Sequence, residues 1–531
     1  MKINTLKEGD KMSHQNKELM NEYDVVVIGA GIGGLTCGAS LAKEGLKTLV
    51  VEQYAVPGGY VTSYKRKGFT FDVPDISAAC RKEGPIGKIF SELGLWDEIE
   101  FIESEPYLKY IFPEHSIRVY TNIEKYKEQL IRACPAEKEN VNRYYETLAK
   151  FWRDMCISPS NPSKVQLLSF PLKYPTLFKY RNKVFKDLLD THFDDQKLKA
   201  ILPAHWAYLG LPPSRISALS MVMMLMGYHM GGAWYPKGGY QKLTDAFVSS
   251  LKKHNGTLLL KALVTKILIQ NGRAVGIELK NGTKIKAKYV ISNADSKLTF
   301  LKLVGEENLK KKFVEKIKSL EMSVSGFVVH LGVDVDLSKL DLNYAAVVYY
   351  PSYDIEEPFK AYENNEILDI DRMHFGISVT SLHDPSLAPE GKHALLITLP
   401  VVPYHYKNDW MTESGKKRGE DYRKLKEELA DRLIEAAEKI VPDLSKHIVV
   451  KDIATPMTYE RYTLSSDGAW YDVAITPEQS GLNRLPIKTP IERLYLTGSS
   501  TIGGGTTACI ISGINTANFI LGRKHVNVLA Y

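Results

Sequence analysis

The sequence feature that most constrains the fold is an apolar run near the N-terminus that stops abruptly at a cluster of glycines. DVVVI at residues 24–28 predicts a short buried strand, and GAGIGG at residues 29–34 ends it in a tight turn. Apolar residues at helical spacing over 35–42 predict a helix, which Gly45 ends. Residues 48–51 are apolar again and predict a second strand. The chain therefore begins an α/β fold with a strand, a helix and a strand.

The spacing of the glycines in this turn indicates a ligand. Gly29 permits the tight turn, Gly31 lets a pyrophosphate approach the backbone, and Gly34 lets the helix pack closely on the strand. Glu52, at the end of the second strand, can accept hydrogen bonds from ribose hydroxyls and would disfavour a 2′-phosphate. A dinucleotide is therefore the predicted ligand. Its predicted contacts in this unit are Gly29, Gly31, Ile32, Gly33, Gly34, Glu52 and Gln53.

Length and composition limit the class of protein. A chain of 531 residues exceeds what one hydrophobic core usually supports, which predicts two or three lobes. The net charge of +7 is small for this length, and basic and acidic residues are interspersed, so no nucleic-acid partner is predicted. The five cysteines are scattered and lack CxxC spacing, which predicts neither a disulfide framework nor a metal site. A reducing cytoplasm is the predicted location.

Two kinds of segment bear on membranes. Residues 1–22 mix charged and polar groups without an apolar centre, which predicts a loose leader. The longest uncharged stretches, 216–234 and 494–522, are rich in Gly, Ser, Thr or Tyr, so no spanning helix is predicted. Residues 167–185 interleave Leu, Phe and Tyr with Lys and Arg, a composition typical of a segment that touches a membrane surface. A surface loop covering the core would have the same composition.

Periodicity changes along the chain and predicts how the lobes are arranged. Charged amphipathic helices are predicted at 124–133 and 141–151. Short strands return at 264–293, with Asn271-Gly272 and Asn281-Gly282 placed as hairpin turns. Further strand signals at 326–348 and 374–402 and a helical pattern at 422–440 predict a mixed sheet with covering helices.

These patterns predict an α/β protein in which a discontinuous Rossmann-like domain is interleaved with a mixed-sheet substrate domain and a helical lobe. The predicted order is a loose leader (1–22), a first part of the dinucleotide domain (23–75), a helical and substrate lobe (76–235), a second part of the dinucleotide domain (236–300), a substrate domain (301–485) and a third part of the dinucleotide domain (486–531).

Three further segments favour FAD over NAD as the dinucleotide. Pro57-Gly58-Gly59 predicts a tight turn suited to close cofactor approach, and residues 69–72 predict a short strand. LYLTGSSTIGGGTTACIISG, at residues 494–513, predicts a strand, a glycine-rich turn and the start of a terminal helix. The positive end of that helix can stabilise negative charge on a reduced isoalloxazine ring. We therefore predict FAD as the cofactor.

The chain resembles the phytoene desaturase, carotenoid isomerase and retinol saturase family of FAD-dependent proteins over nearly its full length. The resemblance rests on six stretches, which are YDVVVIGAGIGGLTCGASLAKEGLKTLVVEQ, PGGYVTSYKRKGFTFD, GGAWYPKGGYQKLTDAF, VTKILIQNGRAVGIELKNGTKIKAKYVISNAD, SLHDPSLAPEGKH and LYLTGSSTIGGG. It implies a backbone contact from Val264 to the adenine region and a place for residues 503–506 beside the flavin ring. The further cofactor contacts expected are Gly58, Gly59, Tyr60, Val264, Asn293, Gly498, Ser499, Gly504, Gly505 and Thr506.

The chain also departs from the family's pattern. Tyr60 stands where many relatives have Arg or Ser after the paired glycines, and FDVPD at residues 71–75 replaces a glycine-bearing turn. The floor of the substrate site is therefore expected to differ. Gly498 is followed by Ser499 rather than by an acid, so backbone groups are expected to hold the ribityl phosphate region.

The resemblance implies an enzyme that moves hydride between a substrate carbon and the flavin ring. The expected substrate is an apolar lipid such as a carotenoid, a retinoid or another isoprenoid, whose carbon–carbon bonds are desaturated or saturated. A cis–trans isomerase without net electron flow would use the same motifs. A lipid carrier is a further alternative, because Rab GDP-dissociation inhibitors share the general fold. The electron donor or acceptor stays open between a quinone, a reduced carrier and NAD(P)H.

Candidates for acid or base work surround a methionine-rich run at residues 221–226. His205, Tyr208 and His229 flank this run, while Glu460 and Arg461 lie in TPMTYERYT. The run itself could line an adaptable apolar tunnel or pack as an ordinary helix.

Overall fold

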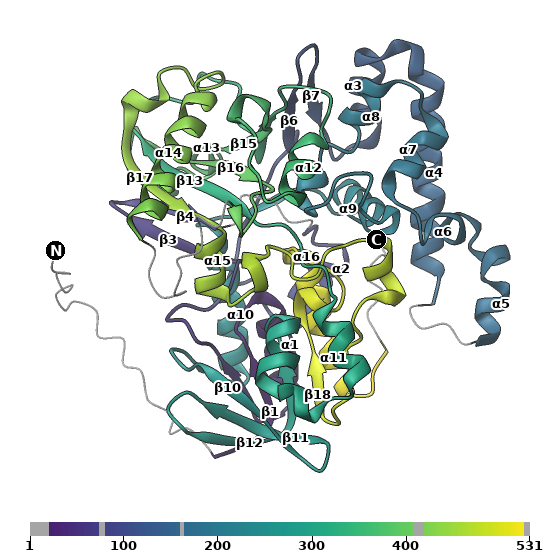
Figure 1. Ribbon diagram of the computed structural model, residues 1–531, viewed down its shortest axis with the longest axis vertical. Coiled ribbons are helices and arrows are strands. Elements are labelled where there is room, and N and C mark those ends of the chain that lie inside the picture. Colours follow the sequence, from purple (N-terminus) through teal and green to yellow (C-terminus); the bar gives the residue numbers. More distant parts are fainter. Residues whose placement is uncertain (1–20, 74–79, 160–163, 407–418, 525–531) are drawn as a thin grey trace.

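The computed structural model describes residues 21–73, 80–159, 164–406 and 419–524. In these residues two seven-stranded sheets stand one above the other, with a group of helices to one side (Figure 1). The predictions that fall on residues 1–20, on Pro74 and Asp75, and on residues 525–531 lie outside the described residues.

The first sheet forms around β1, whose apolar residues are buried. β1 pairs in parallel with β2 on one side and with β12 on the other, and β12 also pairs in parallel with β18 from the far end of the chain. Asn271 and Gly272 both have positive φ and join β10 to β11, which confirms the predicted hairpin. The strands of this sheet are β1 (Glu22–Ile28), β2 (Thr48–Val51), β9 (Thr257–Leu259), β10 (Val264–Gln270), β11 (Arg273–Leu279), β12 (Lys284–Ser292) and β18 (Leu494–Leu496).

Helices from both ends of the chain cover the first sheet. α1 (Ile32–Lys43) packs beside α10 (Tyr240–Lys253) and beside the terminal helix α16 (Thr506–Ile520), as Figure 1 shows. A Cβ on Gly513 of α16 would lie 2.5 Å from the carbonyl oxygen of Gly33, so only a glycine allows this close approach. The two ends of the chain therefore build one domain.

The second sheet is mixed, as predicted. Its order is β17-β13-β16-β15-β14-β6-β7, and all neighbours are antiparallel except β14 and β6. Two of its strands, β6 and β7, come from the segment in which only helices were predicted. Each is four residues long, too short for a clear alternation in the sequence. The strands are β6 (Leu108–Ile111), β7 (Ser116–Val119), β13 (Gly326–Val333), β14 (Ala346–Tyr349), β15 (Phe375–Ser378), β16 (His393–Pro400) and β17 (Ile448–Ala454).

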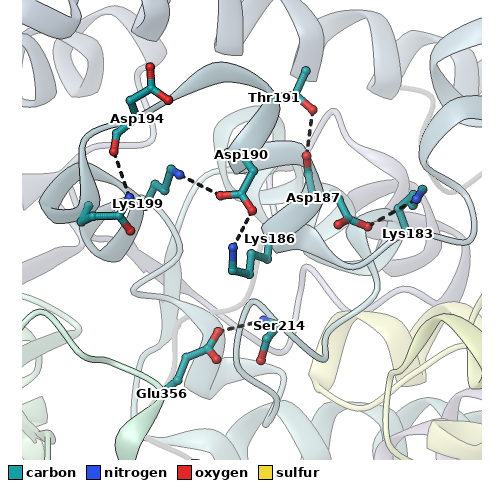
Figure 2. Close-up of polar contacts among 10 residues, drawn as sticks. Lys183, Lys186, Asp187, Asp190, Thr191, Asp194, Lys199, Ser214 and Glu356 are labelled. Atoms are coloured by element: carbon teal, nitrogen blue, oxygen red, sulfur yellow. Dashed lines mark hydrogen bonds and ion pairs between the residues drawn. The ribbon is translucent and has the colours of Figure 1, made fainter.

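The helical lobe is held by a core of buried aromatic and aliphatic side chains, including Phe151, Phe185 and Trp206. Its outer surface carries ion pairs: Lys186 and Lys199 both contact Asp190, at 2.5 and 2.8 Å (Figure 2). The lobe's helices are α3 (Ile123–Ala133), α4 (Lys138–Ile157), α5 (Lys164–Lys173), α6 (Pro175–Tyr180), α7 (Phe185–His192), α8 (Gln196–Ile201) and α9 (Ala218–Gly231).

A hydrogen bond ties this lobe to the second sheet. The Ser214 N–H donates to a carboxylate oxygen of Glu356 at 2.9 Å, in the segment that follows β14 (Figure 2).

The elements outside the two sheets and the lobe are β3 (Ser63–Arg66), β4 (Phe69–Asp72), β5 (Phe101–Glu103), β8 (Trp234–Pro236), α2 (Pro85–Leu93), α11 (Lys311–Lys318), α12 (Glu357–Glu363), α13 (Thr380–His383), α14 (Glu420–Ala437) and α15 (Pro456–Thr463).

Candidate cofactor and substrate site

A cavity of about 490 Å³ lies where the first sheet, the second sheet and the helical lobe meet. At one end its wall is made of glycine turns and acidic side chains of the first sheet. Elsewhere the wall is mainly apolar and aromatic, and comes from the helical lobe and the second sheet. One cavity thus joins a polar, backbone-lined part to an apolar part.

The polar part begins at the turn between β1 and α1. Gly31 precedes the first turn of α1, and no side chain of the described residues caps that helix. A Cβ on Gly31 would lie 2.8 Å from the side-chain nitrogen of Asn293, and one on Gly34 would lie 2.2 Å from the carbonyl oxygen of Gly29. Uncapped helix N–H groups behind a cradle without side chains fit an anionic phosphate.

Glu52 stands at the carboxyl end of β2, where a ribose would lie in this fold. It is 8% exposed, and its two carboxylate oxygens accept hydrogen bonds from the N–H groups of Ala30 and Tyr54, at 2.9 and 2.8 Å. Burial raises the pKa of this carboxyl above its usual range, while the backbone donors oppose that shift. The backbone therefore holds an acceptor at the cavity wall.

The paired glycines after β2 lie against this first turn. The Gly58 N–H donates to the Ala30 carbonyl at 2.8 Å, and both Gly58 and Gly59 have positive φ. The Tyr60 hydroxyl donates to the Ala469 carbonyl at 2.9 Å. The turn predicted from Pro57-Gly58-Gly59 thus forms part of the same wall.

Asn293 lies between the N-terminal and C-terminal glycine turns. Its backbone N–H donates to the Ile28 carbonyl at 2.9 Å, and a Cβ on Gly498 would lie 2.2 Å from its side-chain oxygen. The Gly498 N–H donates to the Ser512 hydroxyl at 2.7 Å, and Gly505, with φ of 95°, precedes α16. The C-terminal turn is therefore fixed at the same wall as the first.

Most of the predicted cofactor contacts meet at this cavity. Gly34 and Gly498 do not line it and instead allow close packing behind it. The predicted residues that line the cavity are Gly29, Gly31, Ile32, Gly33, Glu52, Gln53, Gly58, Gly59, Tyr60, Val264, Asn293, Ser499, Gly504, Gly505 and Thr506.

Two buried acids that sequence reasoning missed also line the cavity. Asp472 has φ of 59°, and its carboxylate accepts hydrogen bonds from Ser296, at 3.2 Å, and from Ser500. Burial, and then the charge of nearby Asp295, raise the pKa of Asp472 to about 7. The position of Asp295, two residues after Asn293, could have identified it, whereas nothing in the sequence around Asp472 indicates its strained backbone.

Arg484 stands behind these acids and is itself buried. Its guanidinium donates to the carbonyls of Ser499, at 2.7 Å, and Val473, at 3.0 Å. Burial lowers the pKa of this guanidinium to about 10, and the Asp472 carboxylate opposes the shift. Arg484 therefore holds the C-terminal turn in place through backbone contacts.

The methionine-rich run at residues 221–226 was predicted either to line an apolar tunnel or to pack as an ordinary helix, and its residues divide between these two roles. Met221 and Met226 on α9 are buried in the core of the helical lobe, while Met223 and Met224 line the apolar part of the cavity. Because α9 turns once in 3.6 residues, neighbouring methionines face different surroundings. Both the helix-packing and the tunnel interpretation describe part of the run.

The predicted acid and base residues do not form one group. His205 and Tyr208 line the cavity, but His229, Glu460 and Arg461 do not. His205 shares a hydrogen bond of 2.6 Å with the Tyr107 hydroxyl, and burial lowers the pKa of His205 to about 3.

The other three candidates are occupied by neighbours. His229 contacts the Thr121 carbonyl at 2.8 Å, Glu460 accepts from the Tyr404 hydroxyl at 2.5 Å, and Arg461 lies over the ring of Tyr462. Catalytic roles for all five residues stay predictions.

Within the described ranges no cluster of His, Cys, Asp or Glu is suited to a metal ion, and no helix combines the length and the apolar character that a membrane span needs.

Comparisons with known proteins define the class and then the family. The fold is similar to that of two solved structures. An oxidoreductase from Methanosarcina mazei has a TM-score of 0.62 at 19% identity, covering 94% of this chain and 100% of its own. A putrescine oxidase triple mutant has a TM-score of 0.64 at 15% identity, covering 95% of this chain and 99% of its own. With the glycine turn and Glu52, this fold defines a dinucleotide-binding protein.

The sequence comparisons identify the family. Residues 32–521 match the family described as flavin containing amine oxidoreductase. The chain is 30% identical to prolycopene isomerase 1 of an Oncidium hybrid cultivar, covering 94% of this chain and 84% of that protein. It is 26% identical to all-trans-retinol 13,14-reductase of Danio rerio (99% and 89%) and 26% identical to a 4,4'-diapophytoene desaturase of a Methylomonas species (96% and 96%).

The chain belongs to the flavin-containing amine oxidoreductase family, and it is an FAD-dependent enzyme. The resemblance to carotenoid desaturases, carotenoid isomerases and retinol saturases is thereby confirmed. The residues present fit FAD, because Gly31 lines the cavity at the uncapped N-terminus of α1 and Glu52 presents carboxylate oxygens at the expected ribose position.

Proposed function

We propose that this enzyme adds or removes a carbon–carbon double bond in an apolar polyene lipid of the carotenoid or retinoid type. The observation that carries the proposal is one continuous cavity, in which the glycine-lined part, the FAD cradle, joins the apolar part, which we call the chamber. FAD, when bound, supplies a two-electron acceptor or donor. The named relatives, a diapophytoene desaturase and a retinol reductase, support this substrate class.

The residues of the chamber act by binding the substrate and excluding water. Leu108, Val348 and Met224 supply apolar surface, and methionine side chains adapt to irregular ligands. Asp472 can hold a proton near neutral pH at the cavity wall. The substrate is thus held in a dry chamber that opens onto the cofactor cradle.

A second candidate function is cis–trans isomerisation of a polyene without net electron flow. The observation that favours it is the 30% identity to prolycopene isomerases, which exceeds the identity to the reductase and the desaturase. The same chamber would serve both reactions, so product analysis has to separate them.

The proposal is tested by product analysis after incubation of the FAD-loaded enzyme with conjugated carotenoids and retinoids. Loss of two hydrogens by mass spectrometry identifies desaturation, gain of two identifies saturation, and unchanged mass with a new retention time identifies isomerisation. If no polyene yields any product with quinone, NAD(P)H or a reduced carrier supplied, the proposal is wrong.

We also propose that this enzyme works in the cytoplasm and touches a membrane surface through residues 167–185. Leu168 and Leu172 on α5 are 83% and 87% exposed, unlike most large apolar side chains of the protein. Lys173 and Lys179 stand close to them in the sequence, a pairing that suits anionic lipid headgroups.

Vesicle sedimentation tests this contact. L168E/L172E should reduce binding to vesicles of anionic phospholipid about tenfold, because two apolar anchors are lost and two negative charges are added. Leu482, which is 72% exposed, provides the control variant L482E. Equal sedimentation of the wild type and the double variant would contradict the contact, and an equal loss in L482E would contradict its assignment to α5.

A further inference from the structure

The apolar part of the cavity contains an unusual set of buried polar atoms without partners. Both ring nitrogens of His374 are buried and have no hydrogen-bond partner among the described residues. The same is true of the Tyr110 hydroxyl, and both side chains line the cavity. The great majority of buried polar groups in proteins are paired, so such atoms require an explanation.

Neighbouring rings hold His374 in a fixed position. Tyr350 stacks on it, with ring centroids 5.1 Å apart and planes 13° apart, and Trp206 meets its edge at 5.1 Å. The Tyr350 hydroxyl donates to the Ala204 carbonyl at 2.6 Å, which fixes the stacking partner. Tyr110 lies at the edge of Tyr350, with centroids 6.1 Å apart, and so belongs to the same cluster.

These two side chains come from separate parts of the fold. Tyr110 lies on β6, and His374 directly precedes β15. β14 lies between these strands and pairs with both, so the sheet places Tyr110 and His374 beside the same ring, that of Tyr350. The cluster is thus built into the second sheet, away from the glycine cradle of the first.

The charge of the cluster limits what it can bind. Burial lowers the pKa of His374 to about 3, so at neutral pH the ring is uncharged and offers one N–H donor and one acceptor. The described residues that line the cavity include no lysine and no arginine. A carboxylate would therefore be buried without a cation, which is costly, whereas a neutral oxygen would not.

We propose that the cluster of His374 and Tyr110 binds a neutral oxygen, a hydroxyl or a carbonyl, at the end of the polyene substrate. This inference rests on the proposed function and narrows its substrate class. The two side chains can donate to and accept from such an oxygen. A hydrocarbon end leaves their polar atoms unpaired in the bound state, which weakens its binding.

Equilibrium binding to the FAD-loaded enzyme tests the inference, with quenching of tryptophan fluorescence as the readout. The probes are one conjugated isoprenoid polyene in four forms, ending in a primary alcohol, an aldehyde, a carboxylate or a methyl group. We expect the alcohol or the aldehyde to bind about tenfold to a hundredfold more tightly than the methyl and carboxylate forms. The tighter of these two identifies the oxygen as a hydroxyl or a carbonyl.

Two variants locate the preference. H374F keeps an aromatic ring for the stack with Tyr350, and Y110F removes only a hydroxyl. Each should weaken binding of the oxygenated probe about tenfold while leaving the methyl probe unchanged or tighter. Y144F is the control, because the Tyr144 hydroxyl is also buried but this residue does not line the cavity. Y144F should keep the wild-type preference.

Each remaining outcome overturns the inference in a distinguishable way. Equal binding of the methyl and oxygenated probes overturns it and leaves the proposed function intact. A preference that survives in both H374F and Y110F, in protein that retains its FAD absorbance, overturns the assignment to this cluster. Tightest binding of the carboxylate form overturns the charge argument, and a failure of all four probes to bind overturns the inference together with the polyene substrate class.

Discussion

At the scale of single residues, the cofactor site depends on positions where a side chain would fill the cradle. Gly31 stands before the uncapped N-terminus of α1, Gly33 allows the close approach of Gly498, and Asn293 lies between the two glycine turns. The glycine spacing makes this part predictable, because a tight turn before an uncapped helix has few chemical uses.

Gly31→Ala tests this cradle. The added methyl group would lie 2.8 Å from the Asn293 side-chain nitrogen, at a cavity-lining position beside the uncapped N-terminus of α1, so FAD affinity should fall at least about tenfold. The measurement is the FAD content of the purified variant and its Kd for added FAD. Gly227→Ala on α9 is the control, since a Cβ there also faces the cavity, in its apolar part, but meets nothing within 4 Å. Full FAD retention by Gly31→Ala would contradict the assignment.

The residues of the apolar chamber were mostly not predictable. His205 and Tyr208 were identified from their closeness to the methionine run, but His374 and Tyr110 are far apart in the sequence and stand in no motif. Both lie beside Tyr350 because β14 pairs with both β6 and β15. Asp472 likewise depends on a backbone conformation that residue type does not indicate.

At the scale of elements, long periodic segments and glycine turns were predicted well. The helix expected at 422–440 is α14 at Glu420–Ala437, and the strand expected at 48–51 has those bounds. β6 and β7 were missed because strands of only four residues, placed before the charged helices, carry too little alternation to be recognised. Their place in the second sheet depends on long-range pairing.

The helix α9 carries methionines with two different roles: Met223 lines the cavity, and Met221 packs in the core of the helical lobe. Met223→Trp should reduce kcat/KM for a polyene about tenfold, because the larger ring occupies the chamber, while FAD content stays unchanged. Met221→Ala, in the core, should instead lower the free energy of unfolding by about 2–5 kcal/mol. Steady-state kinetics and urea unfolding of both variants check this division, and it would be contradicted if Met223→Trp left kcat/KM unchanged.

At the scale of the whole molecule, three distant parts of the chain build one cofactor domain. β1, β12 and β18 are neighbours in the first sheet although they come from the start, the middle and the end of the sequence. Residues of the second sheet and the helical lobe complete the lining of the cavity. The interleaved order was predictable from the returning strand signals, whereas the shape of the chamber was not.

Stability of the whole molecule should fall on acidification because several histidines are buried uncharged. Burial lowers the pKa of His330 to about 4, while the unfolded chain titrates near 6.5. Below pH 6.5 the unfolded state therefore binds more protons, and the folded state loses stability as the pH falls towards 4. At pH 5 this one group should cost about 2 kcal/mol.

His330→Phe removes that contribution without changing a residue that lines the cavity. The loss of unfolding free energy between pH 7.5 and pH 5, measured with urea, should be smaller in the variant by about 2 kcal/mol. An identical loss in wild type and variant would show that His330 is not held uncharged in the folded protein.

The central claim is that FAD and a polyene react within one cavity, and anaerobic absorption spectroscopy tests it most directly. A conjugated polyene is added to the FAD-loaded enzyme in its oxidised form and, separately, in its prereduced form. We predict that the oxidised flavin bleaches if the reaction is desaturation, and that the prereduced flavin reoxidises if it is saturation. If the reaction is isomerisation, the polyene spectrum shifts while the flavin spectrum returns unchanged. A protein without a flavin band, or a flavin and a polyene that both stay unchanged in either redox state, would contradict the account.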